Sequence, residues 1–305
     1  MRFATGRHVG HSGSSAGRGI VFGPIVEDHL VDVSHVFADP RDALDLDARE
    51  VLDRAIASGA HVAVDELRWL PPIPMPRRIL CIGVNYATHR AESDRSAEGE
   101  QPVVFTRFAS SFVGHGEPIE RPPVSDQFDF EGELAVVIGR RARYLSPNDA
   151  LSAVAGWTCC MDGTLRDFQR HTSQFTPGKN FERSGAIGPW IVTADELPDA
   201  ADLQLTTTVS GEVMQSASTR DLIHDVADLI AYCSTFTTLE PGDVIATGTP
   251  GGVGYARTPQ RFLVPDDVVE VTIEHVGTLR NVVIDERDED ERGVSGERRS
   301  TTPAR

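Results

Sequence analysis

The stretch that most constrains this chain runs from Phe128 to Gly139 and carries two carboxylates, Glu131 and Glu133, beside a short apolar segment. Leu134 to Ile138 is partly β-branched and ends at a glycine, which predicts a buried strand. Side chains two residues apart on a strand point to the same face, so we expect Glu131 and Glu133 to lie side by side. A fold built around this segment therefore has to accommodate two neighbouring acids.

Two interpretations of this pair remain open from the stretch itself. Carboxylates at that separation repel each other, so one of them has to take up a proton, face water or share a cation. A set of oxygen ligands suits a hard divalent ion, Mg²⁺, Mn²⁺ or Ca²⁺, better than it suits zinc. The alternative is a solvated strand end, because exposed acidic residues are common on protein surfaces.

A third carboxylate follows another predicted strand. Trp157 to Met161 is apolar and delivers Asp162, immediately before a glycine, to the strand end. Asp162 is therefore a candidate third ligand, or else the aspartate of an ordinary turn or helix cap. Three carboxylates and one divalent ion leave a charge of about −1 by simple addition, so an anionic substrate needs a nearby cation. Arg166 and Lys179 are the nearest such residues in the sequence.

A candidate proton-transfer pair follows the predicted strand Ile79 to Val84. His89 and Glu92 are three residues apart and are neighbours on one face if this segment is helical. A carboxylate beside an imidazole fixes its tautomer and raises its basicity, which suits a general base. The same spacing is also an ordinary surface feature of a helix start.

Composition and charge limit the classes of partner. The chain has 305 residues, of which 40% are hydrophobic and 25% charged, and these values are typical of globular proteins. A net charge of −17 argues against nucleic acid and against an anionic membrane as partner. Apolar runs of membrane-spanning length and a signal-peptide core are not found in the sequence. The four cysteines lack metal or disulfide spacing, so we expect a cytoplasmic protein with reduced thiols.

The chain divides into three segments by composition. Residues 1–72 predict a small N-terminal β-rich domain, and the proline-rich stretch Pro71 to Pro76 marks its boundary. Residues 73–285 alternate short strands with turns, and their clearest predicted helix covers Thr219 to Phe236. Charge, Ser, Gly and Pro dominate residues 286–305, which we expect to form a disordered tail.

Several of these motifs occur together, and in the same order, in one known family. Residues 78–283 resemble the fumarylacetoacetate hydrolase family, and the N-terminal segment is similar to the small domain of its bacterial members. The matching segments are Gly83-Val84-Asn85-Tyr86 with His89 and Glu92, Glu131-Gly132-Glu133-Leu134, Ala155-Gly156-Trp157 before Asp162, Arg166-Asp167, Gly178-Lys179, Leu239 to Asp243, and Thr247-Gly248-Thr249-Pro250. Separate motifs in the right order are far more specific than any one of them.

The resemblance implies an α+β, mostly β fold. In this fold a mixed β-roll or barrel forms the catalytic domain, helices flank it, and the protein is usually a homodimer. Glu131, Glu133 and Asp162 are implied to bind Mg²⁺, or Mn²⁺ or Ca²⁺ in its place, and His89, oriented by Glu92, is implied to be the general base.

The resemblance also implies a set of substrate contacts on the segment that follows the third ligand. Arg166, Gln169 and Arg170 share one helical face. Of these, Arg166 and Gln169, together with Lys179, are implied to hold or polarise the oxygens of the substrate. Thr249 is implied to contact its carboxylate.

Three departures from the family pattern lie in or beside the implied site. Arg107 stands where the family usually has a lysine before a Ser pair, and Met161 stands where an asparagine is common. Gly163-Thr164-Leu165 replaces a small Val-Ser-Ala segment. These positions bear on the substrate more than on the metal, and we count Arg107 among the expected substrate-binding residues.

The expected function is hydrolysis of a carbon–carbon bond in a 1,3-dicarbonyl acid of the acylpyruvate or fumarylpyruvate type, a reaction class of aromatic catabolism. The ion holds the 2-oxo-carboxylate end, His89 takes a proton from water, and positive charge stabilises the enolate that bond cleavage leaves. One alternative is an isomerase or decarboxylase of a hydroxymuconate-type diacid or oxaloacetate. Another is a catalytically idle protein that binds a metal and a small molecule. All three readings take a small anionic oxo acid as partner.

Overall fold

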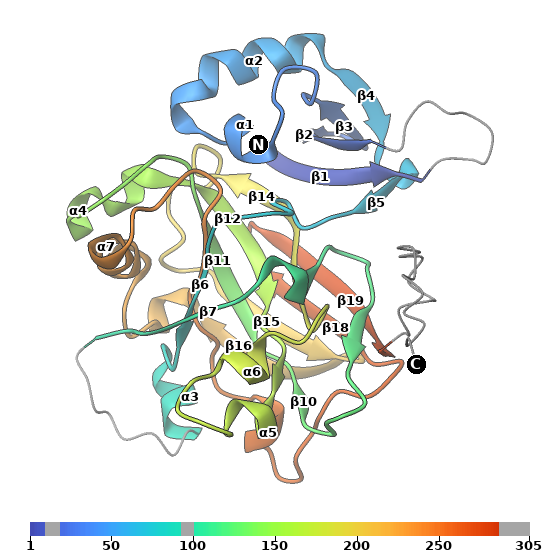
Figure 1. Ribbon diagram of the computed structural model, residues 1–305, viewed down its shortest axis with the longest axis vertical. Coiled ribbons are helices and arrows are strands. Elements are labelled where there is room, and N and C mark those ends of the chain that lie inside the picture. The colour runs from blue at the N-terminus through green and yellow to red at the C-terminus, as the bar shows by residue number, and fades with distance from the viewer. Residues whose placement is uncertain (10–18, 93–100, 287–305) are drawn as a thin grey trace, which may run out of the picture.

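The computed structural model describes residues 1–9, 19–92 and 101–286. The tail expected over residues 286–305 lies outside this part of the chain, apart from Glu286. Strands account for more of the described structure than helices do, and the sheets contain both parallel and antiparallel pairs. The predicted α+β, mostly β class with mixed sheets is therefore confirmed (Figure 1).

The largest sheet has twelve strands and runs through the whole molecule. Its strand order is β4-β3-β2-β1-β14-β12-β11-β17-β6-β7, with β5 paired to β1 and β8 paired to β14. The strands are β1 (Arg2–His8), β2 (Ile20–Val26), β3 (His29–Asp32), β4 (Ala60–Ala63), β5 (Leu67–Trp69), β6 (Ile79–Gly83), β7 (Val103–Thr106), β8 (Phe112–Val113), β11 (Gly132–Ile138), β12 (Val154–Met161), β14 (Gly185–Thr193) and β17 (Val244–Ala246).

A second sheet of five strands packs against the middle of the first, and two short strands form a separate pair. The second sheet has the order β16-β15-β18-β19-β9. Its strands are β9 (Ile119–Arg121), β15 (Gln204–Val209), β16 (Glu212–Ser218), β18 (Val268–Ile273) and β19 (Gly277–Asp285), and the separate pair is β10 (Phe128–Asp129) with β13 (Thr164–Leu165).

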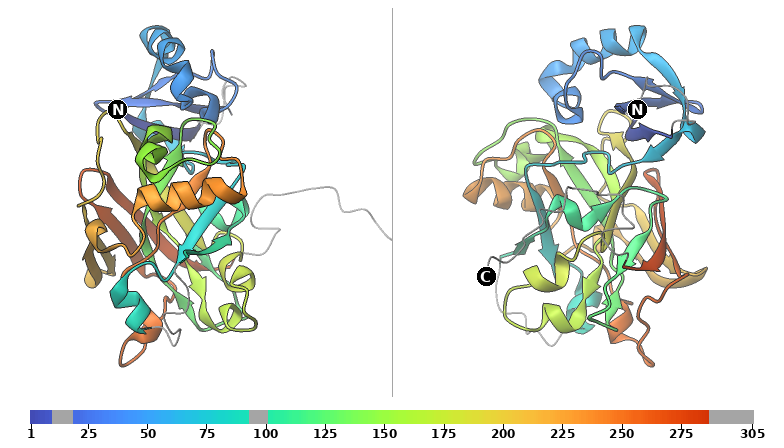
Figure 2. Two further views of the ribbon diagram at one scale, coloured as in Figure 1. Left: turned by 90° about the vertical axis from the view of Figure 1, so that its left-hand side faces the viewer. Right: turned by 45° about the vertical axis from the view of Figure 1, so that its right-hand side comes forward.

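The helices are short and lie on the outside of the sheets (Figures 1 and 2). α3, α5 and α6 gather at the end of the molecule opposite the N-terminal segment, whereas α7 lies along the outside (Figures 1 and 2). Their bounds are α1 (Pro40–Ala43), α2 (Arg49–Ser58), α3 (Ala87–Glu92), α4 (Pro147–Ala150), α5 (Arg166–Gln169), α6 (Thr176–Lys179) and α7 (Val226–Phe236).

The helix predicted over residues 219–236 begins later than its apolar spacing indicates. Thr219–Asp221 forms a 3₁₀ turn, and α7 starts at Val226. Asp225 precedes the helix in an extended conformation and its side chain accepts a hydrogen bond from the backbone of Asp228 at 2.8 Å. An aspartate in this position caps a helix, because it satisfies a backbone donor that has no partner within the helix.

β11 and β12 are buried along their whole length, as their continuous apolar sequences predict. One face of β11, with Leu134 and Val136, packs into the main core against the five-stranded sheet. Ala135 on the other face belongs to a smaller cluster that also contains Cys160. Because side chains alternate along a strand, Glu133 is directed to the same face as Ala135. The position of the acids is therefore fixed by the burial of their apolar neighbours.

The N-terminal segment is joined to the rest of the molecule by the large sheet. β1 pairs with β14 in antiparallel register, with Arg2 opposite Val192. The apolar cluster of this segment also contains four residues from beyond residue 72: Ile73, Val137, Ala155 and Ile191. The two parts therefore share core as well as backbone hydrogen bonds. Among the described helices, none is long and apolar enough to cross a membrane.

Candidate active site

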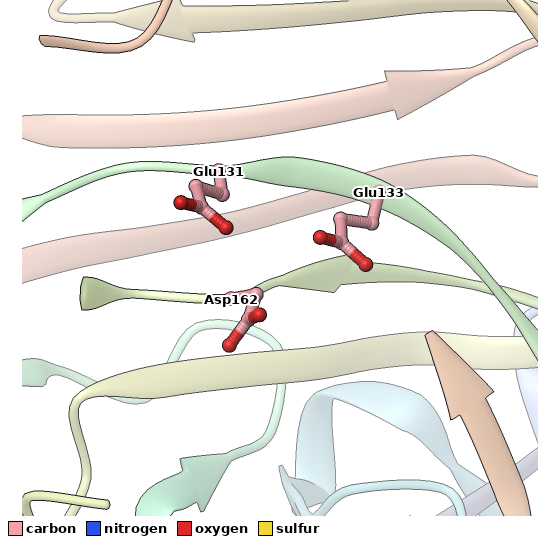
Figure 3. Close-up of side chains that lie close together, drawn as sticks. All are labelled: Glu131, Glu133 and Asp162. Carbon is pink, nitrogen blue, oxygen red and sulfur yellow. The ribbon is translucent and has the colours of Figure 1, made fainter. Parts of the chain in front are cut away.

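The structure brings Glu131, Glu133 and Asp162 together, and their carboxylates offer oxygen atoms that all lie within 4.8 Å of one another (Figure 3). The register of two antiparallel strands produces this cluster. Glu133 on β11 lies opposite Cys160 on β12, so the residue just before β11 meets the residue just after β12. The backbone N–H of Asp162 donates to the carbonyl of Glu131 at 2.8 Å and locks this end of the strand pair.

Three buried cations surround two of the three carboxylates. The Lys179 ammonium donates to Glu131 Oε2 and to Asp162 Oδ2, each at 2.7 Å. Arg166 Nη1 lies 2.6 Å from Glu131 Oε1, and Arg107 Nη1 donates to Asp162 Oδ1 at 2.6 Å. Burial alone would raise the pKa of Glu131, but Lys179 and Arg166 outweigh it and lower this pKa to about 2. Glu131 is therefore ionised at neutral pH.

Glu133 differs from its two neighbours because no cation lies within ion-pair distance of it among the described residues. Its Oε2 accepts a hydrogen bond from the backbone N–H of Gly248 at 2.9 Å. Burial, followed by the charges of Asp162 and Glu131, raises the pKa of Glu133 well above its usual range. A buried carboxyl in this situation needs one more positive charge, and a hard divalent ion bound to the three oxygens would supply it. The residues present therefore fit such an ion.

His89 lies on α3 with its two ring nitrogens in different surroundings. Nδ1 is 3.4 Å from Glu92 Oε2, which leaves Nε2 as the nitrogen that can exchange a proton with a substrate. The other carboxylate oxygen of Glu92 accepts a hydrogen bond from the backbone N–H of Gly252 at 2.7 Å. Glu92 is thus held from outside its own helix, and it fixes the imidazole in turn.

A single cavity of about 320 Å³ connects the metal-ligand candidates with most of the other predicted residues. Its walls come from β6, β7, α3, α5, α6, the start of β11 and the loop after β17. Seven of the ten predicted site residues line it: His89, Glu131, Glu133, Arg166, Gln169, Lys179 and Thr249. The other three are not lining residues. Glu92 lies next to His89, and Arg107 lies next to Asp162. Asp162 itself lies beside Glu131 and Glu133, and these three acids are called the carboxylate trio below.

Arg107 does not line the cavity, so the structure does not support the expected substrate contact. Its guanidinium is buried, and besides Asp162 it donates to the Ser111 hydroxyl at 3.0 Å, the Gly163 carbonyl at 3.1 Å and the Ser184 hydroxyl at 2.8 Å. These partners use the guanidinium donors within the protein, and Arg107 is not among the residues that line the cavity. Arg107 holds the carboxylate in place.

The Thr249 side chain lines the cavity, but its hydroxyl already has partners. It donates to the Gly132 carbonyl at 3.0 Å and accepts from the Gln215 amide at 2.8 Å. A hydroxyl has one hydrogen to donate, so it cannot also donate to a substrate carboxylate in this arrangement. The Thr249 side chain therefore stabilises the start of β11.

Two residues that the sequence analysis did not select complete the site. Asp129 accepts hydrogen bonds from Arg166 Nε at 2.7 Å and from the backbone N–H groups of Gly254 at 2.7 Å and Tyr255 at 3.0 Å. The sequence pattern could have identified Asp129, because it lies two residues before Glu131 in the same acidic stretch. Tyr255 lines the cavity as well, and only the folded loop after β17 brings it there.

One cavity thus brings an imidazole and two buried cations to three carboxylates that could hold a divalent ion. Residues 78–284 match the family model described as fumarylacetoacetate (FAA) hydrolase C-terminal, and the chain belongs to this family. The resemblance stated from the motifs is thereby confirmed.

Curated relatives and solved structures name more than one activity. A mitochondrial oxaloacetate tautomerase of Bos taurus is 41% identical over 237 residues, covering 77% of this chain and 75% of the relative. An oxaloacetate tautomerase of Bacillus subtilis (strain 168) is 40% identical over 224 residues, covering 72% and 74%. The structure of maleylpyruvate hydrolase from Sphingobium sp. SYK-6, in complex with manganese (II) ion and pyruvate, has a TM-score of 0.75 at 28% identity and covers 94% of this chain and 100% of that one.

Proposed function

We propose that this protein is a metal-dependent tautomerase of oxaloacetate, or of a closely related 2-oxo dicarboxylic acid. The proposal replaces carbon–carbon hydrolysis, the function first expected from the motifs, with the isomerase alternative. It is supported by the curated relatives, since tautomerases that are 40% and 41% identical to this chain are closer in sequence than the solved structures titled as hydrolases, at 36% for a fumarylacetoacetate hydrolase from Exiguobacterium antarcticum and 28% for maleylpyruvate hydrolase.

The observation that carries the proposal is the His89 imidazole in the same cavity as the carboxylate trio. Tautomerisation moves one proton between C3 and the oxygen on C2. His89 Nε2 accepts the proton from C3, and the electron pair of the broken C–H bond forms the C2=C3 double bond of an enolate. The imidazolium then returns the proton to the former ketone oxygen, which gives the enol and restores the neutral base.

The other residues bind and orient the acid. The Lys179 ammonium and the Arg166 guanidinium place positive charge beside Glu131, where negative charge develops on the substrate oxygens. Glu92 keeps the Nδ1 side of His89 occupied, so that the opposite nitrogen faces the substrate. Glu131, Glu133 and Asp162 would hold a divalent ion, which would supply Lewis-acid chemistry when bound.

The test starts from a solution of enol oxaloacetate and follows the decay of its ultraviolet absorbance with protein and Mg²⁺. We expect an acceleration that a chelator removes and that His89→Asn reduces by about 10²–10⁴-fold. His89→Asn should bind Mg²⁺ as tightly as the unchanged protein, because His89 is not among the proposed ligands. If the enol decays equally fast with the variant, His89 is not the proton carrier.

Hydrolysis of an acylpyruvate stays as a second candidate, because the manganese and pyruvate complex of maleylpyruvate hydrolase shares this fold at a TM-score of 0.75. In that reaction His89 activates water instead of removing a substrate proton. Incubation with acetopyruvate and maleylpyruvate decides between the two, since hydrolysis releases pyruvate and tautomerisation does not. Release of pyruvate at a higher kcat/KM than oxaloacetate tautomerisation would reverse the order of the two candidates.

A further inference from the structure

One wall of the cavity consists of two guanidinium groups stacked against one aromatic ring. The guanidinium carbon of Arg166 lies 4.5 Å from the centroid of the Tyr255 ring, and that of Arg170 lies 4.8 Å from it. All three side chains line the same cavity as Glu131 and Glu133. Guanidinium groups stack favourably on aromatic faces, so the ring keeps two like charges close together.

Tyr255 is held in place through its backbone and through its hydroxyl group. The Tyr255 backbone N–H donates to Asp129 at 3.0 Å, and its hydroxyl donates to the carbonyl of Glu92 at 3.2 Å. Asp129 also binds Arg166, and Glu92 ends the helix that carries His89. The stacked wall is therefore positioned relative to both the base and the carboxylate trio, as a binding surface has to be.

Both guanidinium groups have donors that protein acids do not use. Arg170 is exposed and forms no ion pair with the described residues, so its charge is open to a ligand. Arg166 binds Asp129 and Glu131, but its buried Nη2 has no hydrogen-bond partner among the residues that the structure describes. Buried donors are normally paired, so this orphaned group points to an acceptor that comes from a ligand.

Formal charge leads to the same conclusion. The acids of this cluster and the cations around them are equal in number: four carboxylates (Glu131, Glu133, Asp162 and Asp129) and four cations (Arg107, Arg166, Arg170 and Lys179). A divalent ion then adds two positive charges, which a ligand with two carboxylates neutralises and a monocarboxylate does not. The cavity of about 320 Å³ is at the small end of the range for ligand sites, which suits a short diacid.

We propose that Arg170 and Arg166, which stack on Tyr255, form a subsite for one carboxylate of a short 2-oxo dicarboxylic acid. This carboxylate is at the opposite end of the acid from the 2-oxo-carboxylate group, which binds at the carboxylate trio. The inference rests on the proposed function for the identity of that 2-oxo-carboxylate end. Arg170 is then the residue that selects a diacid over a monoacid of equal length.

Two four-carbon 2-hydroxy acids test the subsite without requiring turnover. L-Malate and 2-hydroxybutanoate share the 2-hydroxy-carboxylate end and differ in whether the far end is a carboxylate or a methyl group. Calorimetric titration of each acid into the Mg²⁺-loaded protein should show that malate binds about 10-fold more tightly or better. Arg170→Gln should weaken malate binding by about 10-fold and leave 2-hydroxybutanoate within about 2-fold of its original affinity.

Two further variants separate this role from general loss of charge. Arg170→Lys should retain part of the preference, because it keeps the charge and loses the planar group. Arg141→Gln removes an exposed arginine that pairs with Glu240 and does not line the cavity, and it should leave both affinities unchanged. Equal binding of the two acids to the unchanged protein, or an unaltered preference in Arg170→Gln, would overturn the subsite.

The outcome for the subsite is independent of the outcome for the reaction. A protein that fails to tautomerise oxaloacetate but shows an Arg170-dependent preference for malate has the subsite and lacks the proposed activity. A protein that tautomerises oxaloacetate without any such preference has the activity, and the subsite assignment is then wrong.

Discussion

Glu133 is the acid of the trio that depends most on a bound ion, because the described residues offer it no cation of their own. Burial and the charges of Asp162 and Glu131 raise its pKa well above 4.5, the ordinary value for a glutamate. The metal-free folded protein therefore binds a proton here more tightly than the unfolded chain does. Its free energy of unfolding should fall as the pH rises above about 4.5, by at most about 1.4 kcal/mol per pH unit.

Urea unfolding in the presence of a chelator, compared between the unchanged protein and Glu133→Gln, isolates this contribution. The difference between the two should grow in favour of Glu133→Gln from about pH 4.5 up to the raised pKa and then stay constant. Glu131 does not interfere, since its pKa of about 2 confines its effect to lower pH. With saturating Mg²⁺ the order should reverse, because only the unchanged protein keeps all three ligands. A pH-independent difference would contradict this account.

Arg107 illustrates a residue whose role depends on contacts distant in sequence. Replacing it with methionine leaves Asp162 buried beside a group that cannot donate a hydrogen bond. Breaking a buried pair in this way costs about 3–5 kcal/mol, and Asp162 should also lose its orientation. We expect Arg107→Met to lower the free energy of unfolding by that amount and to weaken Mg²⁺ binding by at least about 10-fold.

Arg107→Lys keeps the charge with fewer donors, and it should lose less of both quantities. Chemical unfolding and Mg²⁺ titration measure them separately. Unchanged Mg²⁺ affinity in a folded Arg107→Met protein would exclude the positioning role.

The three acids of the trio could be selected from the sequence because two simple rules bring them together. Period-two alternation puts Glu131 and Glu133 on one face, and the end of the next apolar strand delivers Asp162. No local rule distinguishes Arg107, behind the site, from Arg170, within it. Their positions follow from how distant strands and loops pack, which spacing along the chain does not encode.

At the scale of elements, the loop from Gly251 to Tyr255 is attached to the helix that carries His89. Gly251 N–H donates to the Thr88 hydroxyl at 3.0 Å, and Gly252 N–H donates to Glu92 at 2.7 Å. Gly252 has a φ of +100°, and a Cβ added to it would overlap the carbonyl oxygen of Met214. Only glycine therefore permits this loop to hold Glu92.

Gly252→Ala should displace the loop and, with it, the Glu92 and His89 pair. We expect kcat to fall by about 10²-fold, since small misplacements of catalytic groups have effects of this size, with Mg²⁺ affinity retained. Gly211→Ala is the matched control: its φ is also positive, at +86°, but an added Cβ meets nothing within 4 Å. Equal loss of kcat in both variants would indicate a general effect of strain.

The helix predicted over residues 219–236 shows where periodicity fails at this scale. Leu222 and Ile223 continue the apolar spacing of α7, so the pattern alone extends the helix to them. In the structure the backbone N–H of Ile223 donates instead to the carbonyl of Asn85 at 2.8 Å, and Leu222 forms an isolated bridge with Tyr86. These contacts to the segment before α3 compete successfully with a helical turn.

For the whole molecule, the shared core predicts that residues 1–72 are required for folding. Their cluster includes Val137 of β11, Ala155 of β12 and Ile191 of β14, and β1 covers an edge of β14. A chain that starts at residue 73 would expose these side chains and leave strand edges open to aggregation. We expect this truncated chain to be insoluble or to unfold at a much lower temperature.

Expression of residues 73–286, followed by thermal unfolding and Mg²⁺ titration, checks this expectation. A soluble truncated chain that melts at the same temperature as residues 1–286 would show that the two parts fold independently. The mostly β class was predictable at this scale because many short apolar segments alternate with turns. That one sheet extends from the first strands into the catalytic part was not, since strand pairing between distant segments leaves no mark on local sequence.

The placement of Lys179 has a consequence for the order in which ligands enter. Its ammonium rests on oxygens of Glu131 and Asp162, the same two groups that a divalent ion would need. An ion held by these carboxylates would compete with the ammonium for their oxygens and would free Lys179 to bind an anion in the cavity that it lines. The oxo acid is therefore expected to bind after the ion.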